Sequence, residues 1–133
     1  MHAVLEKISK IGLVPVIKLD DPDKAVDLAT ALKKGGIPVA EVTFRTQHAA
    51  EAIRRISAEV PQVLTGAGTV TTTEQVDTAV AAGAKFIVTP GFNPKVVDYC
   101  LERNIPIIPG ASGPSEIEQA MERGLEVVKC FPA

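Results

Sequence analysis

A single lysine interrupts an apolar run near the end of the chain. In "LEVVKCF", Leu125 to Phe131, Lys129 lies among residues with the composition of a buried strand. Burying an unpaired ammonium is costly, so such a side chain must pair with a carboxylate or lose its proton. A desolvated lysine close to other cations can attack a ketone and form an imine. The alternative is a lysine at the edge of a sheet whose ammonium reaches water.

A second group of polar residues lies in "EVTFR", residues 41–45. Side chains alternate along a strand, so Glu41, Thr43 and Arg45 share one face and the two apolar residues between them share the other. Glu41 is a candidate general acid and base for the proton transfers that follow imine formation. The planar guanidinium of Arg45 suits a carboxylate. The alternative is a salt bridge between Glu41 and Arg45 with no catalytic duty.

Two further polar residues lie late in their strands. Lys18 closes "VPVIK", and Thr69 follows "GAG". Lys18 and Arg45 are the candidate cations near Lys129, and the hydroxyl of Thr69 could join Arg45 in holding the acid end of a 2-oxo acid. Lys18 could instead be an ion-pair partner of Glu41.

Other chemistries are less well supported. "GAGT" lacks the third glycine of a dinucleotide-binding motif, so we assign Gly66 and Gly68 to close backbone packing. His2 and His48 are isolated from other metal ligands, which argues against a metal site. No organic cofactor is indicated. Cys130 alternates away from its lysine neighbour, and we expect it to be buried beneath a helix.

The elements that must position these residues alternate along the chain. Short runs rich in valine and isoleucine predict strands near residues 13–19, 39–44, 63–70, 86–90, 105–110 and 125–131. Amphipathic segments between them begin at capping residues or prolines, and four end in Gly or Asn, which predicts helices. Strands joined by helical crossovers form a parallel sheet of the α/β class. No linker divides the chain, so we expect a single domain over residues 1–133.

The polar inner positions favour a barrel over an open sheet. Strands of an open sheet covered by helices on both faces should be apolar on both faces, whereas barrel strands direct polar groups to the carboxyl-end rim. Lys18 and Lys129 lie late in their strands, and we expect Thr69 to follow Thr65 and Ala67 along the inner face. The predicted fold is a TIM (β/α)8 barrel type with about six units, hence an incomplete barrel.

The composition narrows the class of partner. The chain has 133 residues, 46% of them hydrophobic, and a net charge of −2 with acids and bases interspersed. No basic patch indicates nucleic acid, and no run is long enough to span a membrane, which leaves a small molecule as the expected partner. Two cysteines without CxxC spacing, and no signal peptide, predict a cytosolic location.

Five motifs follow one another along the chain: "EVTFRT", "GAGTV", "FIVTPGF", "IPIIPGAS" and "VVKCFPA". In this order they resemble the motifs of the 2-keto-3-deoxy-6-phosphogluconate (KDPG) and 4-hydroxy-2-oxoglutarate (KHG) aldolases. The resemblance implies a class I aldolase of carbohydrate metabolism, in the Entner–Doudoroff pathway, that works without a cofactor. It also implies a homotrimer. The Arg-Thr pair in "EVTFRT" favours the gluconate type over the relatives that act on the galactonate epimer.

The resemblance also assigns roles by position. It implies that Lys129 forms the Schiff base with pyruvate and that Glu41 is the general acid and base. It implies that Arg45 binds the pyruvate carboxylate and that Thr69 and Pro90 line the pyruvate pocket. Lys18 stands where some members have arginine, and we count it among the substrate-binding candidates.

The family pattern continues past the last residue of this chain. Members carry a seventh strand with "PTGG" and a glycine-rich eighth strand, which supply the phosphate site, so we expect the chain to be a fragment of a longer protein. A barrel completed by another chain is the alternative. We expect the 133 residues alone to cleave the phosphorylated substrate more slowly than a complete barrel. A catalytically silent part-barrel, serving only folding or assembly, is the alternative function.

Overall fold

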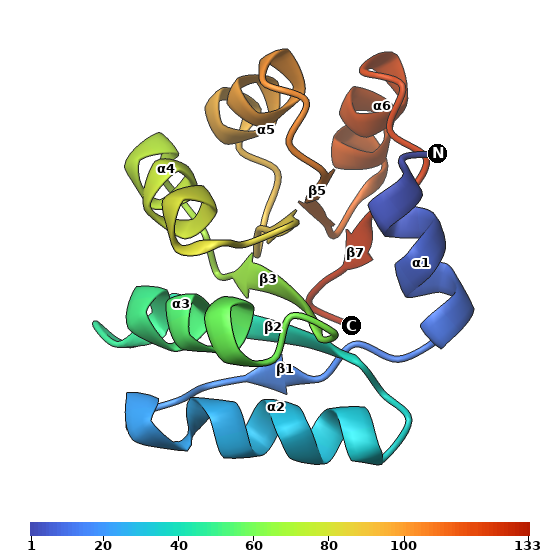
Figure 1. Ribbon diagram of the computed structural model, residues 1–133. Coiled ribbons are helices and arrows are strands. Elements are labelled where there is room, and N and C mark those ends of the chain that lie inside the picture. The colour runs from blue at the N-terminus through green and yellow to red at the C-terminus, as the bar shows by residue number, and fades with distance from the viewer.

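The computed structural model describes residues 1–133 and alternates strands with helices along the chain (Figure 1). The helices are α1 (Ala3–Ile11), η1 (Pro22–Lys24), α2 (Ala25–Lys34), α3 (Ala49–Glu59), α4 (Thr73–Ala82), α5 (Pro94–Glu102) and α6 (Pro114–Glu122). The strands are β1 (Val16–Ile17), β2 (Val39–Thr43), β3 (Leu64–Gly68), β4 (Ile87–Val88), β5 (Ile107–Ile108), β6 (Gly110–Ala111) and β7 (Lys129–Cys130).

All strand pairs are parallel, and the strands follow one another in chain order. One sheet has the order β1-β2-β3-β4-β5, and β6 pairs with β7 in a second. Pro109 separates β5 from β6, so a single predicted strand pairs with β4 through its first half and with β7 through its second half. The prediction of an incomplete parallel barrel is confirmed, and β1 and β7 each have a strand neighbour on one side only.

Helices α2 to α6 cover the outer face of the curved sheet (Figure 1). Outward residues of the strands, including Val42, Ala67 and Ile107, pack with the buried faces of these helices in the larger apolar core. This alternation follows from the period of two along each strand. The inner face is therefore left to a different set of residues.

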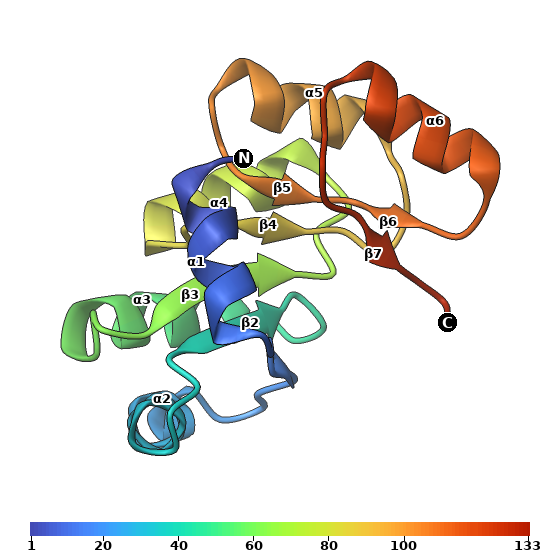
Figure 2. The same ribbon diagram turned by 90° about the vertical axis from the view of Figure 1, so that its right-hand side faces the viewer.

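Helix α1 is the exception to the rule that helices lie outside. Figure 2 shows it crossing the strands near their amino ends. Its residues Val4 and Ile8 pack against a small inner cluster that includes Val39, Leu64 and Phe86. The apolar inner face at the amino end of the strands requires a cover, and the amphipathic α1 provides it.

The helix ends follow the sequence signals. Side chains of Thr72 and Asn93 accept hydrogen bonds from the first turns of α4 and α5. All four predicted C-terminal glycine or asparagine positions have positive φ: Gly36, Gly83, Asn104 and Gly124. This left-handed conformation is costly for most residues and easy for these two types.

The register corrects the assignment of the third strand's faces. Glu41 pairs with Gly66 and Thr43 with Gly68, and paired residues of parallel strands share a face. Thr65 therefore faces outward, because it alternates with Gly66, and Ala67 lies in the outer core. The expectation that these two residues lie on the inner face is wrong.

No helix of the chain has the length and apolar character needed to cross a bilayer.

Candidate active site

Glu41 is the most deeply buried ionisable residue of the inner face. It lies in the middle of β2, between β1 and β3, and is 3% exposed. One of its carboxylate oxygens, Oε2, is buried without a hydrogen-bond partner. Buried carboxylates are normally hydrogen-bonded, so an unsatisfied oxygen in this position marks a group available for chemistry.

Gly68, opposite the end of β2, makes room for this carboxylate. A Cβ atom at Gly68 would overlap Glu41 Oε2 and lie 2.7 Å from Glu41 Cδ. A side chain at Gly66 would likewise overlap the ring of Phe86. The sequence predicts close backbone packing at both glycines, whereas the structure shows that they accommodate side chains from neighbouring strands.

Three of the predicted site residues, Glu41, Lys129 and Arg45, are close enough to interact electrostatically. Burial raises the pKa of the Glu41 carboxyl above its ordinary value, and the positive charges of Lys129 and Arg45 oppose that rise. Desolvation disfavours the carboxylate more than the two cations favour it. A carboxyl with this balance can exchange a proton nearer neutral pH than an exposed glutamate can.

Lys129 reaches this group from the opposite edge of the sheet. It is the first residue of β7 and pairs with Gly110 of β6. The side chain is half-buried, and its Nζ lies 4.7 Å from the centroid of the Phe131 ring. The ammonium forms none of the chain's ion pairs. Lys129 thus lies at a sheet edge while its charge still acts on Glu41, which combines parts of both readings of the sequence.

Arg45 follows β2 by two residues and is exposed. It takes part in none of the chain's ion pairs, so the alternative of a salt bridge with Glu41 is absent from the structure. A guanidinium without an acid partner beside a buried carboxyl is free to bind a ligand carboxylate.

Thr69 and Pro90 end the neighbouring strands. Thr69 follows β3 with a φ of 55°, a left-handed conformation that is strained for a β-branched residue. This conformation breaks the alternation along the strand, so the direction of Thr69 does not follow from its sequence position. Pro90 is half-buried and lines a cavity of about 200 Å³ with Thr89 and Phe92 among its other walls.

Lys18 lies apart from the Glu41 group. Its side chain is 54% exposed, and its Nζ is 3.7 Å from a carboxylate oxygen of Asp20. Its charge is not among those that alter the pKa of Glu41. The suggested ion pair between Lys18 and Glu41 is therefore not formed.

Two buried threonine hydroxyls were not identified as site residues. The Thr43 hydroxyl donates to the Ile17 carbonyl at 2.8 Å and ties β2 to β1. The Thr89 hydroxyl donates to the Gly91 carbonyl at 2.7 Å and accepts a bond from the Gly110 N–H at 3.4 Å. The sequence signal for both residues is a threonine at the carboxyl end of a predicted strand. Buried polar side chains in this position commonly form hydrogen bonds that hold the following loop in place.

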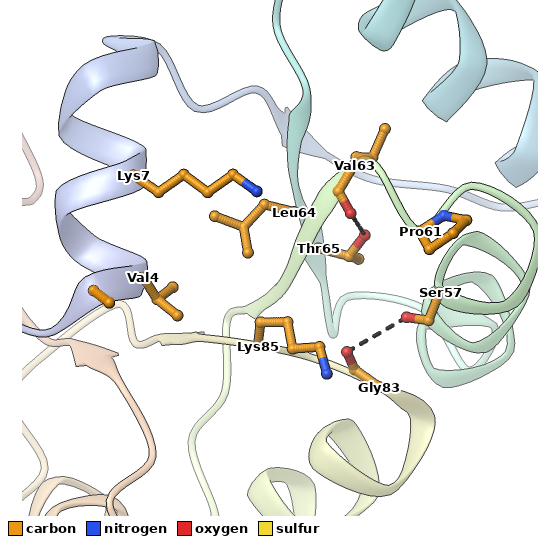
Figure 3. A pocket seen from close by; sticks show the side chains of 10 residues that line it. Val4, Lys7, Ser57, Pro61, Val63, Leu64, Thr65, Gly83 and Lys85 are labelled. Atoms are coloured by element: carbon orange, nitrogen blue, oxygen red, sulfur yellow. Dashed lines mark hydrogen bonds between the residues drawn. The ribbon is translucent and has the colours of Figure 1, made fainter.

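Two features lie outside this group of residues. Cys130 is exposed, so the expectation that a helix buries it is wrong; it lies on β7, which pairs with a strand on one side only. A cavity of about 480 Å³ lies at the amino end of β3 (Figure 3), and Glu41 is not among its lining residues. No group of three or more His, Cys, Asp or Glu residues is arranged to hold a metal ion.

The chain is similar to known aldolases over its whole length. It is 53% identical over 133 residues to the 2-dehydro-3-deoxy-phosphogluconate aldolase of Treponema pallidum, covering 100% of this chain and 63% of that protein. A crystal structure of KDPG aldolase from Zymomonas mobilis matches 95% of this chain and 63% of its own, with 35% identity and a TM-score of 0.88.

A third comparison bears on the chemistry. KDPG aldolase from Legionella pneumophila, solved with pyruvate captured as a covalent carbinolamine, is 40% identical with a TM-score of 0.87. The match covers 90% of this chain and 58% of that one. The chain thus spans less than two thirds of the length of these relatives. Because the family model of the KDPG and KHG aldolases matches residues 4–133, the chain belongs to that family.

Proposed function

We propose that this chain supplies the imine-forming and proton-transferring groups of a class I aldolase. The reaction is the reversible cleavage of KDPG to pyruvate and glyceraldehyde 3-phosphate, with 4-hydroxy-2-oxoglutarate as a further substrate. The names of the similar proteins support KDPG as the substrate, and the family name supports 4-hydroxy-2-oxoglutarate as well. The observation that carries the proposal is the buried, unpartnered carboxylate oxygen of Glu41 under the charges of Lys129 and Arg45.

The first step is nucleophilic attack by Lys129. Its neutral amine adds to the C2 ketone of the substrate to give a carbinolamine, which loses water to form an iminium. The positive iminium nitrogen then accepts the electron pair of the C3–C4 bond. Cleavage releases glyceraldehyde 3-phosphate and leaves the enamine of pyruvate on Lys129.

Glu41 moves the protons that these steps require. A carboxylate beside the imine takes the proton of the C4 hydroxyl as the C3–C4 bond breaks, and the resulting acid returns a proton to C3 of the enamine. Hydrolysis of the iminium then frees pyruvate and the amine. A carboxyl whose pKa is raised by burial serves both directions, because its pKa lies closer to neutral pH than that of an exposed glutamate.

The remaining site residues bind the substrate. Arg45 pairs with the C1 carboxylate through its planar donors, and Thr69 and Pro90 line the pyruvate pocket. Lys18 is assigned to the substrate's outer part, because it is exposed and close to the end of β1. These assignments rest on the resemblance of the motifs, together with the free guanidinium of Arg45.

The domain organisation, the oligomeric state and the cellular location are also proposals. We propose one domain over residues 1–133 and a homo-oligomer, with a trimer implied by the family resemblance. The free thiols of Cys100 and Cys130 support a cytosolic location.

Borohydride trapping tests the proposal on the 133-residue chain. Pyruvate and borohydride should add a reduced pyruvyl group to the peptide that contains Lys129, as measured by mass spectrometry. Trapping needs pyruvate alone, so it does not depend on a phosphate site. The Lys18→Ala variant, matched in residue type, should still be labelled.

Two outcomes would reject the assignment. Label on Lys18 in place of Lys129, or undiminished labelling of a Lys129→Ala variant, would show that another amine is the nucleophile. No label on a folded wild-type chain would favour the catalytically silent part-barrel.

A further inference from the structure

A cavity lies at the opposite end of β3 from the candidate active site. It has a volume of about 480 Å³ and lies between α1, the end of α3 and the turn before β4 (Figure 3). Leu64, the first residue of β3, lines it, whereas Thr69 follows the last residue of the same strand. Five residues of strand place the two sites about 15 Å apart.

Two lysines provide the only charges that line this cavity. Lys7 belongs to α1, and Lys85 lies two residues before β4. Their side chains extend into the cavity from different sides (Figure 3). Neither ammonium is part of any ion pair of the chain. No acidic residue lines the cavity, although the chain as a whole has a net charge of −2. Two unneutralised cations around one cavity favour an anion.

Two hydroxyls among the lining residues have unused hydrogen-bonding capacity. Ser57 donates to the Gly83 carbonyl and Thr65 to the Val63 carbonyl, each at 3.4 Å, which is long for an O–H donor. Thr65 is buried, so its hydroxyl has little access to bulk water. A hydroxyl in this state gains from a stronger acceptor, such as a phosphate oxygen.

Glycine keeps the space beside Ser57 open. Gly83 has a φ of 112°, and a Cβ atom there would lie 2.5 Å from Ser57 Oγ. Its left-handed conformation ends α4 and turns the chain toward Lys85. The same residue thus ends a helix and leaves the Ser57 hydroxyl exposed to the cavity.

The other walls are apolar. Val4, Pro61, Val63 and Leu64 contribute aliphatic surface to the cavity. A ligand that fits both the two lysines and the apolar walls has a multiply charged anionic head and a small uncharged body. A volume of several hundred Å³ is in the range of small-molecule sites.

We propose that this cavity is a second ligand site, which binds small phosphate monoesters with an apolar body. The phosphate lies between Lys7 and Lys85 and accepts hydrogen bonds from Ser57 and Thr65, and the body lies against Val4 and Leu64. This site is separate from the Glu41 group, and its existence does not depend on the proposed aldolase activity.

Phenyl phosphate is a suitable probe, titrated into the isotope-labelled chain and followed by amide NMR. We expect saturable shifts at Lys7, Ser57, Thr65 and Lys85, with a dissociation constant that rises with salt concentration. Inorganic phosphate should shift the same amides with at least tenfold weaker affinity, because it lacks the apolar body. Phenol at the same concentrations should produce no saturable shift.

A pair of double variants provides the matched test. Lys7→Gln with Lys85→Gln should weaken phenyl phosphate binding at least tenfold, whereas Lys10→Gln with Lys95→Gln removes equal charge outside the cavity and should change it less than twofold. Both variants should retain the wild-type circular dichroism spectrum, because the substituted side chains are exposed. Equal weakening by the two variants, shifts confined to residues near Thr69, or no saturable shift would each overturn the proposal.

Discussion

The central strands and the edge strands of this barrel provide opposite environments. β2 and β3 have five residues each, and every one is buried. β1 and β7 have two residues each, and Val16 of β1 is 50% exposed although it pairs with the buried Glu41. Two residues on the same inner face thus differ in burial because one has strand neighbours on both sides and the other does not.

This difference divides the candidate active site. Glu41 lies at the centre, where β2 pairs with a strand on each side and Gly68 leaves space for the carboxylate. The position of Glu41 is therefore set by strands β1, β2 and β3 of this chain. Lys129 lies on an edge strand and contacts Phe131, which is itself exposed. The comparison indicates that the proposed acid-base group is held from both sides, whereas the position of the proposed nucleophile depends on how the edge strand is covered.

The largest expected effect is that of Glu41→Gln, which tests whether Glu41 on the central strand β2 is the general acid and base. In Glu41→Gln the proton carrier is lost while the shape of the site is kept. We expect the exchange of pyruvate methyl protons with deuterated water, followed by NMR, to slow by about 10²- to 10⁴-fold. This partial reaction proceeds through the enamine and requires no phosphate site.

The matched control is Glu74→Gln, an exposed glutamate on α4. It should exchange at the wild-type rate. If Glu41→Gln also exchanged at that rate, Glu41 would not be the general acid and base, whatever the outcome of trapping at Lys129.

A smaller effect is expected when the space for the carboxylate is filled. Gly68→Ala adds a Cβ atom that overlaps Glu41 Oε2, so the carboxyl must move from its position. A misplaced catalytic group loses rate, and we expect exchange to slow by about 10- to 100-fold, with the Lys129 adduct still trapped. Gly91→Ala is the control, because its Cβ would have nothing within 4 Å. Equal rates for the two variants would show that the space at Gly68 is not needed.

Much of the fold, and part of the candidate active site, can be predicted from residue types and their spacing. The order of strands and helices, the four left-handed helix ends and the inner position of Glu41 all follow from local periodicity and capping. These features depend on contacts close in sequence or on alternation along a single strand. They were therefore predicted correctly.

The errors came from features that depend on other strands or on local backbone geometry. Thr65 and Ala67 were assigned to the inner face by counting back from Thr69, but the left-handed backbone at Thr69 breaks the alternation. Gly68 was assigned to backbone packing because its neighbour Glu41 lies far away in sequence. The cover formed by α1 was missed because amphipathicity shows that a helix has an apolar face without showing which side of a sheet it covers.

The contrast in burial predicts different stabilities for two similar truncations. Val39→Ala leaves a cavity in the fully buried inner cluster and should lower the free energy of unfolding by about 2 kcal/mol. Val16→Ala removes the same atoms from a half-exposed edge position and should cost less than about 1 kcal/mol. Urea unfolding followed by circular dichroism measures both. Equal losses would mean that β1 is covered in solution, through association or otherwise.

The smallest effect concerns the dependence of stability on pH. Burial raises the pKa of Glu41, so the folded state favours its protonated form. The wild-type chain should therefore be most stable relative to Glu41→Gln below pH 4.5, the ordinary pKa of glutamate, and lose that advantage as pH rises through the raised value. Urea unfolding of both proteins across this range measures the difference.

Glu51 provides a control of opposite sign for this measurement. Hydrogen bonds from Arg54 and Arg55 lower its pKa to about 2, so its contribution is present above the ordinary value and is lost as pH falls. Because Glu51 is on the surface of α3, solvent screening keeps this effect small. Glu51→Gln should thus lose stability relative to wild type as pH rises from about 2 to 5, while the Glu41→Gln difference changes in the opposite sense. Differences of the same sign for both variants would show that Glu41 is not held in a desolvated position at the centre of the sheet.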